Sequence, residues 1–261
     1  MSDLAFRYER RGAVRWIYIE RPQTRNAMSA RMWSTLHAAI DDVARDPACR
    51  ALVVTGVADA FVSGADIGDF ARFADPAADG VAYEATVEAA LRALEALDAV
   101  TVAAISGACT GGGAVLAAAC DLRVATADAR FGVPIARTVG NMTSAANVAR
   151  LTALVGPALV AELIFTAKLI DANRAHDAGF VGEIVPDRAT LLERAQALAE
   201  SIAANAPSTV RAAKETLRRL RASGGAPVDD RDVLARAYGS DDFREGVAAF
   251  VGKRAARWTG R

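Results

Sequence analysis

Short apolar runs, separated by charged or glycine-containing stretches, mark the predicted strands of this chain. Residues 14–19 alternate between flanking charges, and residues 51–55 form a compact apolar run that ends at Gly56. Apolar runs of this length, rich in β-branched residues, are typical of half-buried or buried strands. The same signal predicts further strands at 101–105, 122–125 and 182–185.

Apolar residues at helical spacing predict helices between and after these strands. Ser29 is suited to cap a helix, and Trp33, Leu36, Ile40 and Val43 then recur every three or four residues, up to about Asp46. Residues 75–80 are predicted as a loop. Further helices are predicted at 81–97, 114–120, 144–154, 158–165, 173–178, 188–205, 208–220, 229–238 and 242–257. Early strands alternating with helices, then helices alone, indicate an α/β core with a helical C-terminal region.

The stretch 101–121, TVAAISGACTGGGAVLAAACD, joins a predicted strand to a predicted helix through three consecutive glycines, Gly111 to Gly113. These glycines leave backbone N–H groups uncovered by side chains, at a helix N-terminus where the dipole favours negative charge. The stretch therefore predicts either an anion or oxyanion site made from backbone or a close-packed turn without chemistry. The residues of this stretch alone do not decide between the two.

The amino-acid composition argues against binding to nucleic acid, membranes or metal ions. The chain has 261 residues, enough for one large domain, and its 31 basic and 31 acidic residues balance, which argues against a nucleic-acid surface. From its charged residues we expect the N-terminus not to act as a signal peptide, and we expect no membrane span, because the longest apolar run is short. Three cysteines without metal-ligand spacing predict no disulfide framework and no metal site. We expect a cytoplasmic protein that binds neither membrane nor metal.

Several motifs, in order along the chain, resemble those of the crotonase family, the enoyl-CoA hydratase/isomerase superfamily. They are ERPQTRNAMS (20–29), AFVSGADI (60–67), ISGACTGGG with AAACDLRVA (105–125), FGVP (131–134), LTALVG (151–156), AHDAGFVGEIV (175–185) and SDDFREGVAAFVGKR (240–254). Each motif is short, but the ordered set covers nearly the whole chain and is specific.

The resemblance implies an α/β fold, a crotonase-like spiral of ββα turns followed by a C-terminal helical trimerisation region. On this basis residues 1–200 are expected to form the spiral core, and residues 201–261 the helical region for oligomerisation. The expected ligand is an acyl-CoA thioester, with no separate cofactor, and the expected assembly is a homotrimer or a hexamer built as a dimer of trimers.

In this family two backbone N–H groups bind the thioester oxygen, and the matching positions are Ala65 and Gly112. Preorganised donors of this kind stabilise the negative charge that an enolate places on that oxygen. The resemblance also implies contacts to substrate or CoA from Ala27, Ser63, Gly64, Asp66, Ile67, Gly111, Pro134, Phe250 and Lys253. Of these, Phe250 and Lys253 belong to a C-terminal motif through which a neighbouring subunit can complete the CoA site.

Two catalytic positions of the family are occupied by apolar residues. Hydratases of the family carry one glutamate three residues after the middle glycine and another directly after the proline of FGxP; here these positions are Val115 and Ile135. Water addition needs one group to activate water and another to deliver a proton. The sequence therefore predicts a lyase or isomerase of this family whose reaction is not standard hydration.

Few other polar groups are candidates for chemistry. Arg137 and Asn141, in the loop that normally holds catalytic residues, are either polar pocket residues or parts of a structural loop. If Arg137 held a substrate carboxylate, decarboxylation would form the enolate without a base. Asp66 is expected to start a helix, and Asp121 to anchor backbone at the start of a strand.

Three alternatives follow from the same residues. The chain could be a catalytically silent acyl-CoA-binding protein, or an ordinary enoyl-CoA hydratase with a non-standard acid or base. A dinucleotide-binding oxidoreductase is excluded, because Gly107 and Gly111 to Gly113 do not form GxGxxG.

Overall fold

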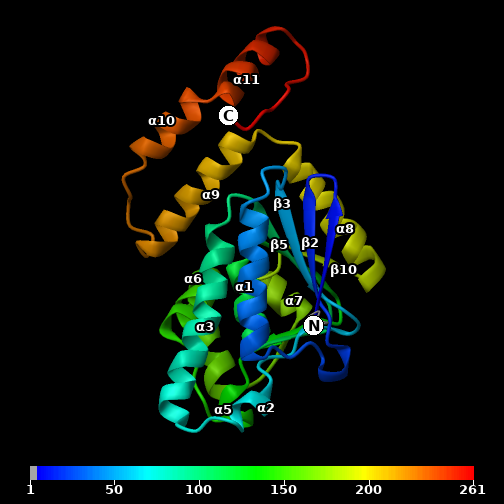
Figure 1. Cartoon of the computed structure of the whole chain (residues 1–261), viewed down its shortest axis with the longest axis vertical. Helices are drawn as coiled ribbons and strands as arrows, with labels where there is room; N and C mark the ends of the chain where they lie inside the picture. The colour runs from blue at the N-terminus through cyan, green and yellow to red at the C-terminus, as the bar shows by residue number, and fades with distance from the viewer. Residues whose placement is uncertain (1–4) are drawn as a thin grey trace.

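The computed structural model describes residues 5–261, and its strands form two sheets (Figure 1). The larger sheet has the order β1-β2-β3-β5-β7-β10; only the β1–β2 pair is antiparallel among these strands. Its strands are β1 (Phe6–Arg11), β2 (Val14–Ile19), β3 (Ala51–Gly56), β5 (Val100–Ile105), β7 (Leu122–Thr126) and β10 (Glu183–Val185).

The smaller sheet has the order β4-β6-β8-β9. Its strands are β4 (Ala60–Val62), β6 (Ala108–Thr110), β8 (Arg130–Gly132) and β9 (Ile170–Asp171). Strands β3, β5 and β7 of the larger sheet are each followed by one strand of the smaller sheet and then by a helix. This repeated ββα turn confirms the spiral that the sequence resemblance implied.

The helices cover both faces of the larger sheet. They are α1 (Ala30–Ala44), α2 (Ile67–Phe70), α3 (Pro76–Ala96), α4 (Gly112–Ala119), α5 (Ile135–Thr138), α6 (Ala145–Thr166), α7 (Ala172–Asp177), α8 (Arg188–Ala203), α9 (Pro207–Ala222), α10 (Arg231–Gly239) and α11 (Asp241–Val251), with a 3-10 turn at Pro22–Thr24. On one face α1, α3 and α4 enclose the main core, and on the other α8 packs through Leu191, Ala195 and Ala199. Burial on both faces explains why β3 is a continuous apolar run instead of an alternating one.

The predicted strands and most predicted helices are confirmed, but α3 starts earlier than predicted. Residues 75–80, predicted as a loop, contain the N-cap and first turn of α3. The Asp75 carboxylate accepts hydrogen bonds from the N–H groups of Ala77 and Ala78, and Pro76 occupies the first helical position. Both are favourable at a helix N-terminus, so this "DPAADG" segment begins a helix despite its proline and glycine.

Helix α6 is the one helix within residues 5–261 whose length and composition would suffice to cross a membrane. Its helical geometry is interrupted at Gly156 (φ 77°, ψ 160°), and Pro157 follows. Leu151, Val160 and Leu163 pack into the main core. The two helical segments predicted at 144–154 and 158–165 are thus the two halves of one kinked helix of the fold.

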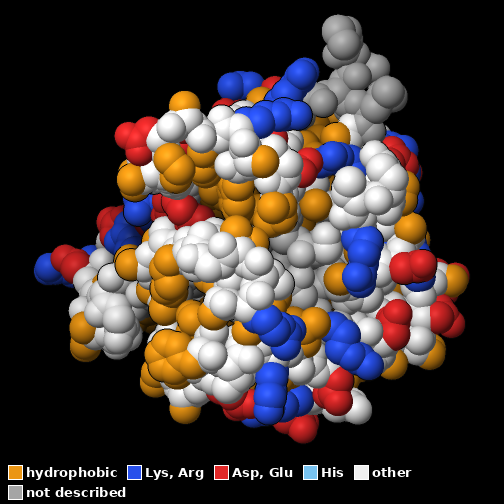
Figure 2. All heavy atoms as spheres, turned by 90° about the horizontal axis from the view of Figure 1, so that it is seen from below, with side chains coloured by type: hydrophobic (Ala, Val, Ile, Leu, Met, Phe, Trp, Pro, Cys, Tyr) orange, Lys and Arg blue, Asp and Glu red, His pale blue; other side chains and the backbone are white. Residues whose placement is uncertain are grey.

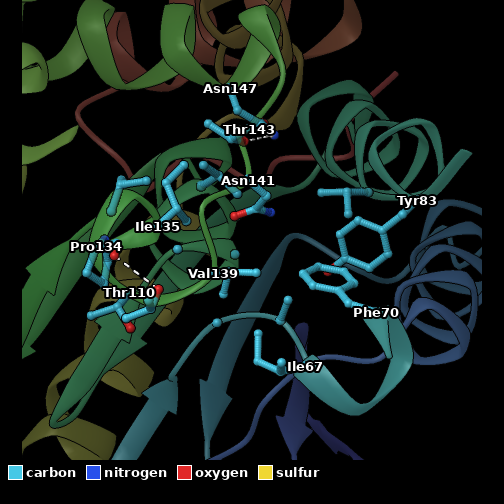
Figure 3. A pocket seen from close by; sticks show the side chains of 18 of the residues that line it. Ile67, Phe70, Tyr83, Thr110, Pro134, Ile135, Val139, Asn141, Thr143 and Asn147 are labelled. Carbon is cyan, nitrogen blue, oxygen red and sulfur yellow. Dashed lines mark hydrogen bonds between the residues drawn. The ribbon is translucent and has the colours of Figure 1, made fainter. Parts of the chain in front are cut away.

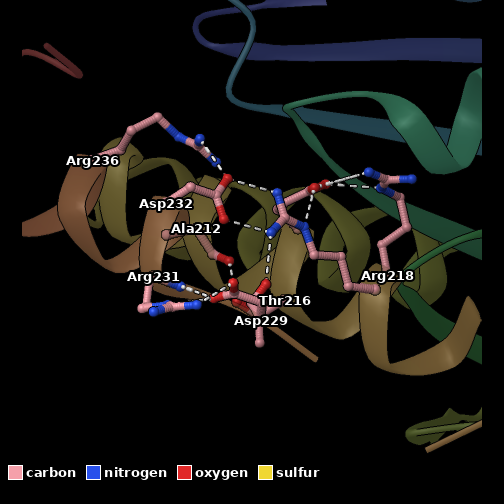
Figure 4. Close-up of polar contacts among 9 residues, drawn as sticks. Ala212, Thr216, Arg218, Asp229, Arg231, Asp232 and Arg236 are labelled. Carbon is pink, nitrogen blue, oxygen red and sulfur yellow. Dashed lines mark hydrogen bonds and ion pairs between the residues drawn. The ribbon is translucent and has the colours of Figure 1, made fainter. Parts of the chain in front are cut away.

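The C-terminal helices lie beyond the sheets, and α10 and α11 project away from them (Figure 1). Arg219 on α9 binds the Asp232 carboxylate on α10 with N···O distances of 2.6 and 2.8 Å, and Arg236 also binds Asp232, at 2.9 Å (Figure 4). Helix α11 ends at Val251, earlier than the predicted residue 257. The predicted division at residues 200 and 201 falls in the last turn of α8 and stays a prediction.

Helix α9 is tied to the spiral by a buried lysine. Lys214 Nζ lies 2.8 Å from the carbonyl oxygen of Ala99 and 2.7 Å from the Asp121 carboxylate. Asp121 also accepts hydrogen bonds from the N–H and hydroxyl of Thr101. The expected anchoring role of Asp121 is confirmed.

Candidate active site

Two glycine turns from neighbouring strands form one end of the candidate site. Strands β4 and β6 are parallel neighbours, and their C-terminal ends lead to Gly64 and Gly111. Both glycines have positive φ, 127° and 52°, which other residues rarely adopt. A Cβ atom at Gly111 would lie 3.6 Å from Cα of Gly64, so the two backbones run in direct contact.

The residues after these glycines, Ala65 and Gly112, present unused backbone donors. Within residues 5–261 neither N–H has a hydrogen-bond acceptor, whereas the N–H of Gly111 donates to Gly132 and that of Asp66 donates to Met28. Gly112 is the first residue of α4, so its N–H has no partner within its own helix. The turns therefore offer two adjacent free donors, one of them at a helix N-terminus.

A cavity of ≈ 370 Å³ lies beside these turns, at the end of the molecule that carries α2 and α5 (Figure 3). It is lined by Ser63, Gly64, Ala65, Ile67, Phe70, Tyr83, Glu84, Val87, Thr110, Gly111, Gly112, Val115, Val133, Pro134, Ile135, Thr138, Val139, Asn141, Thr143 and Asn147. In Figure 2, which views this end from below, apolar side chains gather over much of the left half, and Lys and Arg side chains lie near the lower centre. The wall combines apolar side chains with hydroxyl, amide and carboxyl groups, a mixture that is common in sites for small-molecule ligands.

Val115 and Ile135, which the resemblance predicts to stand at the family's two glutamate positions, both line this cavity. Val115 is buried on α4, one turn after Gly112, and Ile135 is half-buried at the start of α5. The two positions that would hold the acid and base of a hydratase thus give the cavity apolar walls.

Several of the predicted ligand contacts lie on the cavity wall: Ser63, Gly64, Ile67, Gly111 and Pro134. Ala27 and Asp66 are not among the lining residues. The carbonyl oxygen of Ala27 accepts a hydrogen bond from Arg21, which also pairs with Asp66 at 2.9 Å. Asp66 caps α2 by accepting from the N–H of Gly68, so its expected place at a helix start is confirmed.

Of the two candidate polar residues, Asn141 lines the cavity and Arg137 does not. Arg137 lies on α5 with an exposed side chain. Asn141 follows the positive-φ residue Gly140 in the loop between α5 and α6. The structure therefore separates two residues that the sequence placed together.

Phe250 and Lys253 lie far from the cavity within one chain. Phe250 is on α11, at the opposite end of the molecule from α2 and α5, and its side chain is 87% exposed (Figure 1). Lys253 follows α11 in a left-handed backbone conformation (φ 50°). Their role in ligand binding requires a second subunit and stays a prediction.

One cavity residue with acid–base chemistry was missed from the sequence. Glu84 on α3 lines the cavity, and its Oε2 accepts hydrogen bonds from the N–H of Ser144 at 2.8 Å and the hydroxyl of Thr143 at 3.4 Å. No motif contains Glu84. The sequence did contain one indication: Glu84, Glu88 and Glu95 recur at helical spacing next to the apolar residues that α3 buries.

Two lining residues have pKa values that differ from their ordinary ones. Burial raises the pKa of Tyr83 to about 12, although a hydrogen bond from Trp33 Nε1 to its hydroxyl acts in the opposite direction. Burial also raises the pKa of Glu84 above its usual range, against hydrogen bonds from Ser144, Thr143 and Asn147. Neutral Tyr83 is a poor base at physiological pH, whereas Glu84 is a carboxyl group suited to proton transfer.

Within residues 5–261 no group of three or more His, Cys, Asp or Glu side chains is arranged to hold a metal ion. Cys109 and Cys120 are fully buried, and burial raises the pKa of both thiols, for Cys120 to about 12. Neither thiol is therefore a candidate nucleophile at neutral pH.

Comparison with known proteins gives a consistent family. A sequence profile of the enoyl-CoA hydratase/isomerase family matches residues 9–261. A probable enoyl-CoA hydratase of Mycobacterium bovis is 35% identical over 257 residues, which cover 97% of each chain. The mitochondrial Delta(3,5)-Delta(2,4)-dienoyl-CoA isomerase of Rattus norvegicus is 35% identical over 211 residues, which cover 77% of this chain and 64% of that protein.

Solved structures agree. The crystal structure of an enoyl-CoA hydratase/carnithine racemase from Magnetospirillum magneticum superposes with a TM-score of 0.92 at 30% identity, covering 98% of this chain and 96% of that one. The ββα spiral, the paired glycine turns and these matches lead to one conclusion: the chain belongs to the enoyl-CoA hydratase/isomerase family.

Proposed function

We propose that this protein is an enzyme that binds an acyl-CoA thioester and stabilises the thioester enolate through the N–H groups of Ala65 and Gly112. The observation that carries the proposal is the pair of free donors at two touching glycine turns beside an apolar cavity. A preorganised donor aimed at a developing oxyanion stabilises the transition state by about 3–4 kcal/mol. The acyl group would lie against the apolar walls, and the CoA moiety would extend out of the cavity.

The reaction that we propose is not standard hydration. Val115 and Ile135 remove both groups that would handle water and its proton, and they make the adjacent walls apolar. Decarboxylation guided by Arg137 has no support from the cavity, because the Arg137 side chain is not part of its wall. A lyase or isomerase reaction through the enolate remains, and the names of the hydratase and isomerase relatives support a CoA thioester as substrate.

Carbon NMR tests the oxyanion site directly. Hexanoyl-CoA labelled with ¹³C at the thioester carbonyl should bind, and its carbonyl resonance should move downfield because two hydrogen bonds polarise the C=O bond. Crotonyl-CoA should not be hydrated at the rates of ordinary relatives. Bound ligand without a carbonyl shift would contradict the oxyanion site, and ordinary hydration would contradict the role assigned to Val115 and Ile135.

We also propose that the chain works as a cytoplasmic homotrimer or hexamer. Support comes from apolar side chains that α10 and α11 expose away from the spiral: Leu234, Tyr238, Phe243, Val247, Phe250 and Val251. Apolar residues scattered singly over a surface are common, but a group of them on neighbouring helices is typical of a subunit interface.

A further inference from the structure

We propose that Glu84 is the proton-transfer residue of this cavity and that the reaction is the shift of a double bond along an enoyl-CoA chain. Glu84 would take a proton from one carbon of the acyl group and return it to another. This inference rests on the proposed function, because the negative charge formed in between must be held by Ala65 and Gly112. It assigns the chemistry to α3, an element that carries neither of the two replaced glutamate positions.

Glu84 is the only carboxylate among the described residues that line the cavity. Three lining hydroxyl groups donate to backbone carbonyls: Ser63 to Thr24, Thr110 to Ser63, and Thr138 to Pro134. Each is therefore positioned as a structural donor. Among the described lining residues, Glu84 is therefore the group best suited to act as a base.

Glu84 differs from the other acidic residues on its flank of α3 in having no cationic partner. Glu88 and Glu95 both bind Arg150, with N···O distances of 2.5 and 2.9 Å. Among the described residues Glu84 has no ion pair, and it is held only by donors from Thr143, Ser144 and Asn147. A carboxylate paired with arginine is a weak base, whereas burial without a cationic partner raises the pKa of a carboxyl group and with it the basicity, here against the opposing effect of the hydrogen bonds.

The same contacts give Glu84 a fixed position. Asn147 is buried between Thr143 and Arg150: its amide donates to the Thr143 hydroxyl at 3.0 Å and accepts from Arg150 at 2.8 Å. Thr143, Ser144 and Asn147 belong to the loop end and first turn of α6, which is thereby attached to α3. A base that is to act on two carbons in turn has to be held in place between them.

One carboxylate is sufficient for a double-bond shift. In a 3-enoyl thioester the C2–H bond breaks, the proton goes to the Glu84 carboxylate, and the electron pair spreads over the thioester as a dienolate. The carboxylic acid then protonates C4, the C3=C4 bond is lost, and a C2=C3 bond forms. The acyl chain keeps its composition, Glu84 returns to its starting state, and neither water nor a second carboxylate takes part.

The test uses trans-3-hexenoyl-CoA and the full-length protein in D₂O. Formation of the conjugated 2-enoyl thioester is followed by absorbance, deuterium incorporation by mass spectrometry, and binding by calorimetry. In Glu84→Gln an amide oxygen still accepts from Ser144, so the loop stays attached while the base is lost. We expect isomerisation and exchange to fall at least about 100-fold, with a Kd within roughly threefold of the wild type.

The matched control is Glu193→Gln, the same substitution at an exposed position of α8, on the other side of the larger sheet. It should behave as the wild type. Glu84→Asp, which keeps a carboxylate one methylene shorter, should have intermediate activity. The wild-type rate should fall as the pH is lowered, with an inflection above the usual glutamate range, because Glu84 becomes protonated. Glu84→Gln should lack this pH dependence. The neighbouring charged or titratable groups are Glu88, Arg150 and Tyr83.

Four results would overturn the assignment. Activity of Glu84→Gln within tenfold of the wild type would show that another group moves the proton. Loss of ligand binding together with a lowered melting temperature in both Glu84 variants would make Glu84 a structural anchor. If the wild type binds the thioester and shifts its carbonyl resonance without isomerisation or deuterium exchange, this result would contradict the role of Glu84 but not the oxyanion site. A wild type that does not bind the thioester would contradict both.

Discussion

Two adjacent glycines at the start of α4 are needed for different physical reasons. A Cβ atom at Gly113 would lie 2.1 Å from the carbonyl oxygen of Val62, a clash that only a backbone shift relieves. A Cβ atom at Gly112 would lie 3.2 Å from the Trp33 ring and 3.8 Å from the carbonyl carbon of Gly64, which small movements accommodate. Gly113 therefore serves packing, and Gly112 keeps open the space between the two donors.

This difference predicts that alanine at Gly113 lowers stability, whereas alanine at Gly112 lowers activity. Gly113→Ala should lower the free energy of unfolding by about 1–3 kcal/mol or more. Gly112→Ala should fold with near wild-type stability but lose about 100-fold in enolate-dependent proton exchange, because its methyl group fills the site of the thioester oxygen. Chemical denaturation and deuterium exchange measure the two effects. Equal loss of stability in both variants would contradict the distinction.

At the scale of single elements, a buried arginine joins α3 to α6. Arg150 is 7% exposed and binds both Glu88 and Glu95, while Arg92 binds Glu88 from a position that is 73% exposed. Removing one partner of a buried ion pair leaves an uncompensated charge, whereas exposed pairs contribute little. Because Arg150 and Arg92 both pair with Glu88, replacing each in turn compares a buried with an exposed ion pair on the same carboxylate.

Arg150→Met should lower the free energy of unfolding by about 3 kcal/mol, the lower end for a broken buried pair, because Arg92 still pairs with Glu88 and Arg221 with Glu95. Arg92→Met should change it by less than about 1 kcal/mol. Urea denaturation at neutral pH measures both. Similar values for the two variants would show that burial does not set the strength of this network.

A second buried charge fixes the C-terminal residues to the start of α9. The Asp242 carboxylate is 1% exposed and accepts hydrogen bonds from Ser208, Thr259 and Gly260. Burial acts to raise its pKa, but the hydrogen bonds outweigh burial and lower the pKa to about 2, from an ordinary value of 3.8. Its folded pKa is depressed, so its contribution to stability is present above pH 4 and is lost as the pH falls through about 2.

Asp242→Asn should accordingly destabilise the protein by about 2 kcal/mol at pH 7. The difference from the wild type should shrink as the pH falls from about 5 towards 2, because the wild-type carboxylate becomes protonated. Thermal unfolding across this pH range measures the effect. A difference that stays constant with pH would indicate that shape, and not charge, determines the stabilisation.

At the scale of the whole molecule, the exposed apolar side chains of α10 and α11 should control self-association. Phe250 is 87% exposed, so Phe250→Asp should leave the stability of the isolated subunit nearly unchanged while lowering the mass of the assembly. Val81→Asp, at a 74% exposed apolar position of α3, is the control and should keep the wild-type mass. Sedimentation equilibrium distinguishes these outcomes, and a monomeric wild type would contradict the proposed interface.

Sequence patterns predicted most strands of the larger sheet and missed all four strands of the smaller one. Strands β2, β3 and β5 and helix α1 carry six or more residues of consistent periodicity or apolar content. The strands of the smaller sheet have three residues or fewer, which is too short for a period to be recognised. Strand β1 was missed because its charged residues belong to an edge strand with one exposed face.

The sequence by itself determined the family, because its motifs follow one another in a fixed order along the chain. It also predicted Ala65 and Gly112 as oxyanion donors and Val115 and Ile135 as apolar replacements of two carboxylates, because each prediction depends only on the spacing within a local motif. Only the tertiary structure decided which polar groups share the cavity. It separated Arg137 from Asn141, kept Phe250 at the opposite end of the molecule from the cavity, and placed Glu84 on the wall of the cavity that the two glycine turns also line. The physical reason is that the burial and the partners of a side chain depend on elements that are distant in sequence. For Glu84 and Glu88 they depend on how α3 packs against α6.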